Sequence, residues 1–102
     1  MQPLLKTKIE ELIQESLPSW RFDNNYLFRE FKFRNFVDAF SFMTAIALEA
    51  EKIDHHPNWK NVYNEVSICL NTHSAGGVTE KDFNLAGKID RFYVKYVENK
   101  NA

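Results

Sequence analysis

The chain has 102 residues and a formal net charge of −1, and 44% of its residues are hydrophobic while 26% are charged. This length allows one hydrophobic core, so residues 1–102 are predicted to form a single domain, and the composition argues against disorder. The nearly neutral charge provides no basic surface for a phosphate backbone, which argues against direct nucleic-acid binding as the main activity.

The sequence has no apolar stretch of the kind that a signal peptide or a membrane span requires. Its only cysteine, Cys69, cannot form an internal disulfide and is expected to be a small buried side chain in a reducing compartment. Together these features predict a cytoplasmic protein with no membrane contact.

The first part of the chain is predicted to form a helix followed by a β-hairpin. Apolar residues recur at helical spacing over residues 4–16, and Pro18 ends this amphipathic helix. Residues 20–22 and the alternating residues 26–34 are typical of strands. The turn between them falls at residues 23–25, because asparagine tolerates a positive φ.

The central helix is predicted over residues 36–53, with Asn35 as its N-cap and Pro57 fixing its end. Nine of its apolar residues share an arc of about 160°. They are Phe36, Ala39, Phe40, Phe42, Met43, Ile46, Ala47, Ala50 and Ile53. Val37 and Leu48 lie on the other side. So much apolar surface predicts self-association through this helix; deep burial within its own monomer is the alternative.

A second hairpin is predicted from residues 59–63 and 66–72, whose side chains alternate in polarity, with Asn64-Glu65 as the turn. Residues 74–78 form a loop around Gly76-Gly77.

Thr79, followed three residues later by Asp82, resembles a capping box and predicts the start of a third helix, whose polar tail from Glu98 onward is expected to fray. The resulting order is α-β-β-α-β-β-α. This order predicts an α+β fold in which one antiparallel sheet is covered by helices on one face.

Three histidines are candidates for proton transfer. His55 and His56 stand at the predicted end of the central helix, where the helix dipole and neighbouring Asp54 favour a positive charge. His73 ends a predicted strand, beside a Gly76-Gly77 bend that would let it reach a pocket. The three could act as general acids and bases in one cleft, or be ordinary surface or hydrogen-bonded residues.

Other sites are less well supported by the spacing. Three histidines would suffice for zinc, but adjacent residues usually point in different directions, and neither an HExxH spacing nor a cysteine pair is present. Cys69 lies in mid-strand and does not suggest a nucleophile. Trp59 and Phe31 could stack on a flat heterocycle or simply pack in the core. Asp82 could cap a helix, orient a histidine, or do both.

Three segments resemble the pterin-4a-carbinolamine dehydratase family. They are FVDAFSFMTAIALEAEKIDHHPNW, NVYNEVSICLNTH and GVTEKDFNLAGKI, within residues 36–89. The resemblance is most specific at a few positions that occur in the family's order and spacing, namely His55-His56, Pro57, Trp59, Asn61-Val62-Tyr63-Asn64 and Thr72-His73. The N-terminal third of the chain is a weaker match.

The resemblance implies a four-stranded antiparallel sheet with three helices packed on one face. It also implies a hydro-lyase that removes water from 4a-hydroxytetrahydropterin (4a-hydroxytetrahydrobiopterin) to give quinonoid dihydropterin, in the recycling of the pterin used by aromatic amino acid hydroxylases. The family needs no metal and no organic cofactor, which favours proton-carrying histidines over metal ligands. Which pterin is the physiological substrate stays open.

On this resemblance, His55 and His73 are expected to carry the two proton transfers, and His56 to position the pterin. Which histidine gives the proton and which takes it stays open. The other residues expected at the substrate site are Trp59 lining the pocket, Asp82 orienting a histidine, Thr72 and Asp54.

The resemblance also implies partners. Some animal members act as dimerisation cofactors of a homeodomain transcription factor through the long central helix, which otherwise joins subunits into a tetramer. We therefore expect a homo-oligomer, dimer or tetramer, built through residues 36–53. The alternative function is a binding module for a transcription factor, in which case a eukaryotic protein would also enter the nucleus.

Overall fold

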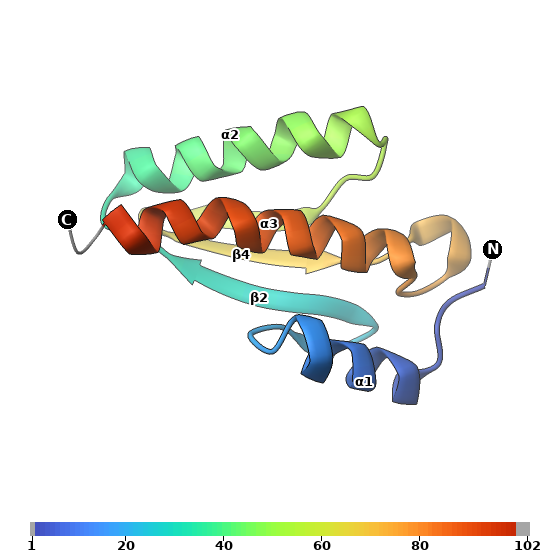
Figure 1. The fold of residues 1–102 in the computed structure, drawn as a ribbon. Coiled ribbons are helices and arrows are strands. Elements are labelled where there is room, and N and C mark those ends of the chain that lie inside the picture. The colour runs from blue at the N-terminus through green and yellow to red at the C-terminus, as the bar shows by residue number, and fades with distance from the viewer. Residues whose placement is uncertain (1, 100–102) are drawn as a thin grey trace.

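A computed structural model describes residues 2–99 of the chain, which form a four-stranded antiparallel sheet and three α-helices (Figure 1). The elements are α1 (Lys6–Ser16), β1 (Arg21–Asp23), β2 (Tyr26–Lys32), α2 (Phe36–Lys52), β3 (Asn58–Val62), β4 (Glu65–Leu70), the 3-10 turn η1 (His73–Ala75) and α3 (Glu80–Asn99). The predicted order α-β-β-α-β-β-α is confirmed.

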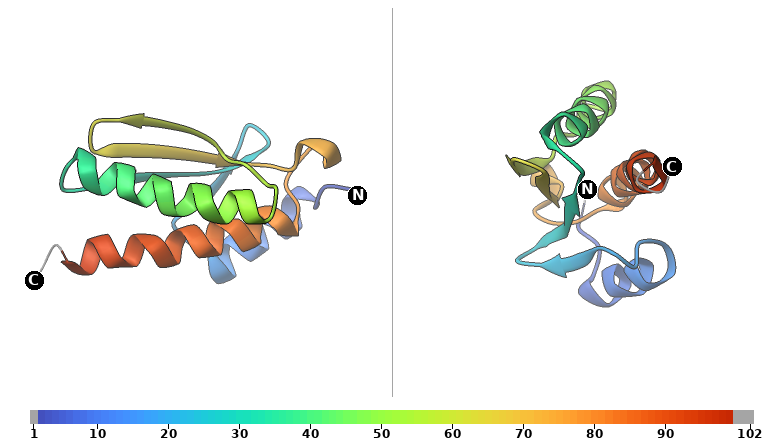
Figure 2. Two further views of the ribbon diagram at one scale, coloured as in Figure 1. Left: turned by 90° about the horizontal axis from the view of Figure 1, so that it is seen from above. Right: turned by 90° about the vertical axis from the view of Figure 1, so that its left-hand side faces the viewer.

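The strands lie in the order β1-β2-β4-β3, and every neighbouring pair is antiparallel. The two hairpins therefore meet at the centre of the sheet, where Leu27 of β2 pairs with Leu70 of β4 and Phe31 with Val66. Figure 2 shows the three helices on one side of the sheet, with the other side uncovered. The predicted fold class, with helices on one face, is confirmed.

Alternating side chains separate the two faces of the sheet. The central strands bury Leu27, Phe31, Val66, Ile68 and Leu70 on the covered face. Each such side chain contributes roughly 1.5–3 kcal/mol on burial. A slip of one residue in register would turn this whole set toward solvent, so the strand pairing is strongly specified. Phe31 is thus a core residue, which confirms the second of its two predicted alternatives.

The first hairpin turns at Asn24-Asn25, as predicted, and both asparagines have a positive φ, of 51° and 68°. The second hairpin turns one residue earlier than predicted. Val62 pairs with Glu65, so the turn is Tyr63-Asn64, and Tyr63 has a φ of 51°. The side-chain amide of Asn64 donates to the carbonyl of Phe33 (2.9 Å), which ties this turn to the end of β2.

Helix α2 begins where predicted, because the side chain of Asn35 accepts the N–H of Asp38 (2.8 Å). Its end differs from the prediction. Asp54 has a left-handed φ of 51°, its N–H bonds the carbonyl of Glu51, and the N–H of His55 bonds the carbonyl of Ala50 (3.0 Å). This is a Schellman turn. The turn, rather than Pro57 further on, stops the helix.

One face of α2 is buried against the sheet and α3, through Ala39, Phe42, Ile46 and Ala50. The opposite face carries large apolar side chains into solvent. They are Phe36 (48% exposed), Val37 (68%), Phe40 (55%) and Leu48 (64%). The alternative prediction, that the apolar residues of this helix are all deeply buried within the monomer, is therefore wrong. The arc of nine apolar residues has a buried part and an exposed part.

The other helices differ little from expectation. Helix α1 starts two residues later than predicted, and α3 follows Thr79 and continues through Asn99. The tail predicted to fray from Glu98 is thus helical in its first two residues, and residues 100–102 lie outside the described part. Within residues 2–99, no helix is both long and apolar enough to span a bilayer.

Cys69 lies in the middle of β4, as predicted, but it is half-buried rather than buried. It pairs with Phe28 of β2 and Asn58 of β3, on the uncovered face of the sheet, which explains the difference. Partial burial, with a further contribution from the negative charge of Asp23, raises the pKa of the Cys69 thiol. The thiol therefore stays protonated at neutral pH, which does not suit a nucleophile.

A polar contact beneath the sheet joins three distant parts of the chain. Oδ1 of Asp90 in α3 accepts from Nη1 of Arg29 (2.7 Å) and from Nε1 of Trp20 (2.8 Å). The Arg29 guanidinium also lies 4.5 Å from the ring centroid of Phe31 and 5.1 Å from that of Tyr93. Arg29 can therefore face the helices because its charge is paired and its planar group rests on aromatic rings.

We expect Asp90→Ala to lower the free energy of unfolding by about 1–3 kcal/mol, because Arg29 and Trp20 would each lose their acceptor. Urea denaturation followed by circular dichroism measures this. Glu49→Ala is the matched control, since it removes an ion pair between the half-buried Glu49 and the exposed Lys52 (3.5 Å) and should cost less than about 1 kcal/mol. Equal losses for the two variants would contradict this role of Asp90.

Candidate active site

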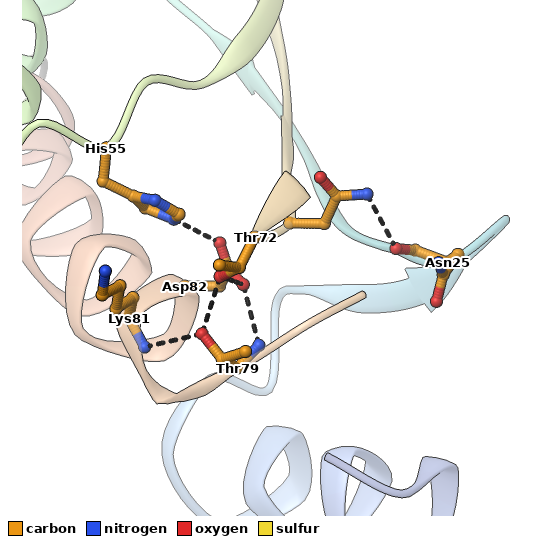
Figure 3. Close-up of polar contacts among 7 residues, drawn as sticks. Asn25, His55, Thr72, Thr79, Lys81 and Asp82 are labelled. Atoms are coloured by element: carbon orange, nitrogen blue, oxygen red, sulfur yellow. Dashed lines mark hydrogen bonds and ion pairs between the residues drawn. The ribbon is translucent and has the colours of Figure 1, made fainter. Parts of the chain in front are cut away.

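Four side chains form a buried hydrogen-bonded cluster where the end of α2, the end of β4 and the start of α3 meet (Figure 3). They are Asp82 (0% exposed), Thr72 (3%), Thr79 (5%) and His55 (8%). Nε2 of His55 lies 2.6 Å from Oδ1 of Asp82, and the Thr72 hydroxyl lies 2.9 Å from Oδ2. Two segments far apart in sequence thus converge on one carboxyl group.

Local sequence places Asp82 at this point. Thr79 immediately precedes α3, and its N–H donates to Oδ2 of Asp82 (2.8 Å), while its hydroxyl accepts the N–H of Lys81 (3.3 Å). The Asp82 half of the predicted capping box is confirmed, with Asp in the position usually held by Glu or Gln, whereas the Thr79 hydroxyl caps Lys81 instead of Asp82. An acidic side chain in the first turn is also favoured by the helix dipole.

His55 reaches the same point because α2 ends in the Schellman turn. The positive φ of Asp54 reverses the chain, and the backbone bond from His55 to Ala50 fixes where the imidazole ring leaves the helix. The predicted location of the histidine pair at a helix C-terminus is confirmed. The turn also separates the two rings, since His55 is buried while His56 is exposed.

The contact with Asp82 makes the two ring nitrogens of His55 differ in protonation. When Asp82 is a carboxylate it can only accept, so Nε2 carries a proton and Nδ1 holds the lone pair of the neutral ring. Nδ1 has no hydrogen bond to any described residue, and every buried side-chain nitrogen or oxygen in residues 2–99 has a partner. Nδ1 therefore reaches the surface, where it can exchange a proton with a bound molecule.

The other two histidines lie outside the cluster. Nε2 of His56 is 2.8 Å from Oε1 of Glu51 in the last turn of α2, in an exposed pair. His73 is exposed and begins η1 directly after Thr72. Thus only His55 touches Asp82, while the backbone of His73 starts one residue away from the cluster.

The loop that carries His73 is held in a defined shape. The predicted bend is confirmed, because Gly76 has a φ of 76° and its carbonyl accepts the side-chain amide of Asn25 (3.0 Å). A Cβ on Gly77 would lie 2.9 Å from Cβ of Pro3, so only glycine fits against the N-terminal segment. The loop is therefore braced by the first hairpin and by the residues before α1.

The remaining expected substrate contacts are dispersed. Thr72 has its hydroxyl on Asp82, so both lie in the cluster. Asp54 is exposed and forms the turn after α2. Trp59 is half-buried in β3, where it pairs with Ile68 and packs against the core. Together with Phe28, it also borders a hollow on the uncovered face of the sheet, away from the cluster.

Sequence reasoning missed two contacts. Thr79 was expected only as a cap, yet its hydroxyl lies 2.6 Å from that of Thr72; the Thr-x-x-Asp spacing was the available signal. Glu51 was not identified from the sequence as a partner of His56. Their contact crosses the end of α2, where helical spacing no longer predicts which side chains meet. Within residues 2–99, no three His, Cys, Asp or Glu side chains are grouped so that they could hold a metal ion.

Comparison with known proteins identifies the family to which the chain belongs. Residues 2–92 match the sequence profile of the family described as pterin 4 alpha carbinolamine dehydratase. A protein of Prochlorococcus marinus strain NATL2A is 50% identical over 86 residues, which cover 84% of this chain and 90% of that protein. One from Solibacter usitatus is 49% identical, with 85% and 90% covered. Both are provisionally named pterin-4-alpha-carbinolamine dehydratases.

Two solved structures share the fold. A transcriptional coactivator/pterin dehydratase from Brucella melitensis has a TM-score of 0.85 and 39% identity, covering 90% of this chain and 99% of that one. A pterin dehydratase-like protein, described as a RuBisCO assembly factor in the alpha-carboxysome, has a TM-score of 0.64 and 27% identity, covering 74% and 89%. The profile match over most of the chain, together with these relatives, shows that the protein belongs to the pterin-4a-carbinolamine dehydratase family.

Proposed function

We propose that the protein is a hydro-lyase that removes water from a 4a-hydroxytetrahydropterin and gives the quinonoid dihydropterin. The observation that carries the proposal is the buried pair of His55 and Asp82 (2.6 Å), which holds the ring with Nδ1 at the surface. Membership of the family supplies the substrate class. The cytoplasmic location expected from the sequence stays a prediction.

The reaction suits acid–base catalysis because it involves no net oxidation. The C4a–oxygen bond breaks with a proton delivered to the departing hydroxyl, the proton on N5 is removed, and the electrons of the N5–H bond form the double bond between N5 and C4a. Water and the quinonoid dihydropterin are the products. Positioned acids and bases typically contribute about 10² to 10⁴ in rate to each such transfer.

In this proposal, His55 carries one proton through Nδ1, while Asp82 holds the ring and stabilises it when it is charged. His73 carries the other proton, from a loop whose shape is fixed by Gly76. His56, paired with Glu51, positions the pterin. Trp59 and Asp54, expected from the resemblance as further substrate contacts, stay predictions.

We expect His55→Ala and His73→Ala each to lower kcat about 10²-fold or more, because each removes one proton carrier. His56→Ala should instead act mainly on KM, as expected for a residue that binds the substrate. The measurement is the rate of carbinolamine dehydration, followed by absorbance. Glu15→Ala, on the exposed side of α1, is the control and should keep the wild-type rate. A wild-type kcat in either the His55 or the His73 variant would contradict the assignment.

A chelator tests the chemistry in a different way. If the histidines are proton carriers, dehydration should proceed at an unchanged rate after dialysis against EDTA, because no metal takes part. Loss of activity that returns on addition of zinc would mean that the histidines are ligands, and would refute the acid–base proposal.

A second function is favoured by the exposed apolar surface of α2, formed by Phe36, Val37, Phe40 and Leu48. Apolar patches of this kind mark protein interfaces. We propose that α2 joins copies of this chain into a dimer or tetramer. Binding of a transcription factor through the same surface is the alternative, and it is in keeping with the coactivator description of the Brucella protein.

Phe40→Glu should convert the oligomer to monomer, because it puts a charge in the centre of this surface. Light scattering after size-exclusion chromatography should give a multiple of 12.0 kDa for the wild type and about 12.0 kDa for the variant. Thr7→Glu, on the exposed face of α1, should leave the wild-type mass unchanged. A monomeric wild type would refute the proposed homo-oligomer, and a stable heterocomplex with a transcription factor in a pull-down would favour the alternative.

A further inference from the structure

The two buried threonines of the cluster contact Asp82 in different ways. The Thr72 hydroxyl lies 2.9 Å from Oδ2, whereas Thr79 reaches the same oxygen with its backbone N–H (2.8 Å). The hydroxyl of Thr79 points instead to that of Thr72, at 2.6 Å. The hydroxyl of Thr79 therefore has no direct hydrogen bond to Asp82 and reaches it through the hydroxyl of Thr72.

The number of available protons fixes the direction of these hydrogen bonds. A threonine hydroxyl has one proton to donate. Thr72 gives it to Asp82, so Thr72 has none for Thr79, and Thr79 must be the donor between the two hydroxyls. The Thr79 oxygen meanwhile accepts the N–H of Lys81 (3.3 Å). The donors thus run one way, from Thr79 to Thr72 to Asp82.

This series of hydrogen bonds ends on the carboxyl group of Asp82, which is fully buried. Its ion-pair partner among the described residues is His55. Oδ2 receives two donors, the Thr72 hydroxyl and the Thr79 N–H, and Oδ1 faces the ring of His55. A carboxylate only accepts hydrogen bonds, and the two donors aimed at Oδ2 hold it in one rotamer. The proton shared with His55 then belongs on Nε2.

We propose that Thr79 is a positioning residue that acts through Thr72: its hydroxyl keeps Asp82 an oriented acceptor, which holds His55 as the Nε2–H tautomer and presents Nδ1 to the substrate. Neighbouring bonds in such a chain polarise and strengthen one another. Thr79 also caps α3, because its hydroxyl oxygen accepts the N–H of Lys81 and its own N–H donates to Asp82, but neither of these bonds uses the hydroxyl proton.

The effect on catalysis rests on the proposed function, but the state of the His55 ring does not, and it is read without substrate. Nitrogen-15 NMR of histidine-labelled protein distinguishes a protonated from an unprotonated ring nitrogen, and a His55→Gln spectrum identifies the His55 signals. The variants are Thr79→Val and Thr72→Val, which keep the side-chain volume, and Thr79→Ser, which restores the hydroxyl. Thr7→Val, at an exposed position of α1, is the matched control.

In the wild type with a neutral His55 ring, we expect a protonated Nε2 with a slowly exchanging proton and an unprotonated Nδ1. In Thr79→Val, that proton should exchange faster and the two nitrogens should move toward averaged tautomers. Thr79→Ser should restore the wild-type spectrum, and Thr7→Val should not change it. Unchanged His55 signals in Thr79→Val, or the same loss in the Val and Ser variants, would overturn the proposal, because Thr79 would then act only as a cap or by packing.

Kinetics of the dehydration supply a second readout. Thr79→Val should lower kcat about 2- to 10-fold with little change in KM, as expected for the loss of one neutral hydrogen bond. Thr72→Val should lower kcat about 10- to 100-fold, because it removes a bond to a charged group. The double variant should be no slower than Thr72→Val, since Thr79 acts only through Thr72.

A double variant slowed by the product of the two single effects would overturn the one-way chain. If the wild type fails to dehydrate the carbinolamine while the His55 signals respond as expected, the proposed function fails and the positioning inference stands. The spectroscopic and kinetic results therefore separate the two claims.

Discussion

The burial of the Asp82 carboxyl group is the constraint on which the site depends. A carboxylate removed from water is stable only if donors replace the solvent, and Asp82 receives them from His55 after α2, from Thr72 after β4 and from Thr79 before α3. Three elements that pack together through apolar contacts alone could slide by fractions of an ångström. The need to satisfy one buried acid removes that freedom where the chemistry is proposed.

The same residues serve the fold and the site. Thr79 and Asp82 would be needed to start α3 even in a protein without activity, because the first N–H groups of a helix lack partners within it. The Schellman turn that ends α2 likewise directs His55 toward Asp82. The proposed proton carrier is thus supported by bonds that the helix ends already require, which lowers the cost of holding it in place.

The sequence predicted those parts of the fold that depend on burial or on local hydrogen bonds. Alternation located the strands, and Asn35 and Thr79 identified the two helix starts, because a cap is a contact within three residues. Predictions failed where tertiary packing overrode local preference. Tyr63 adopts a positive φ, which is unfavourable for a tyrosine. The burial of Cys69 was overestimated because the sequence does not show which face of the sheet the helices cover. Asp54, rather than a proline, stops α2.

The sequence shows the histidine pair, but it does not show that the two rings lie in different environments. His55 pairs with a residue 27 positions away, a separation that no local period encodes. His56 pairs with Glu51 across the end of α2, where the helical repeat no longer applies. Two identical neighbours therefore become a buried ring with a fixed orientation and an exposed ring beside an acid. This asymmetry follows from the left-handed turn at Asp54, since a helix continued past that point would carry the two rings in directions set by its own repeat.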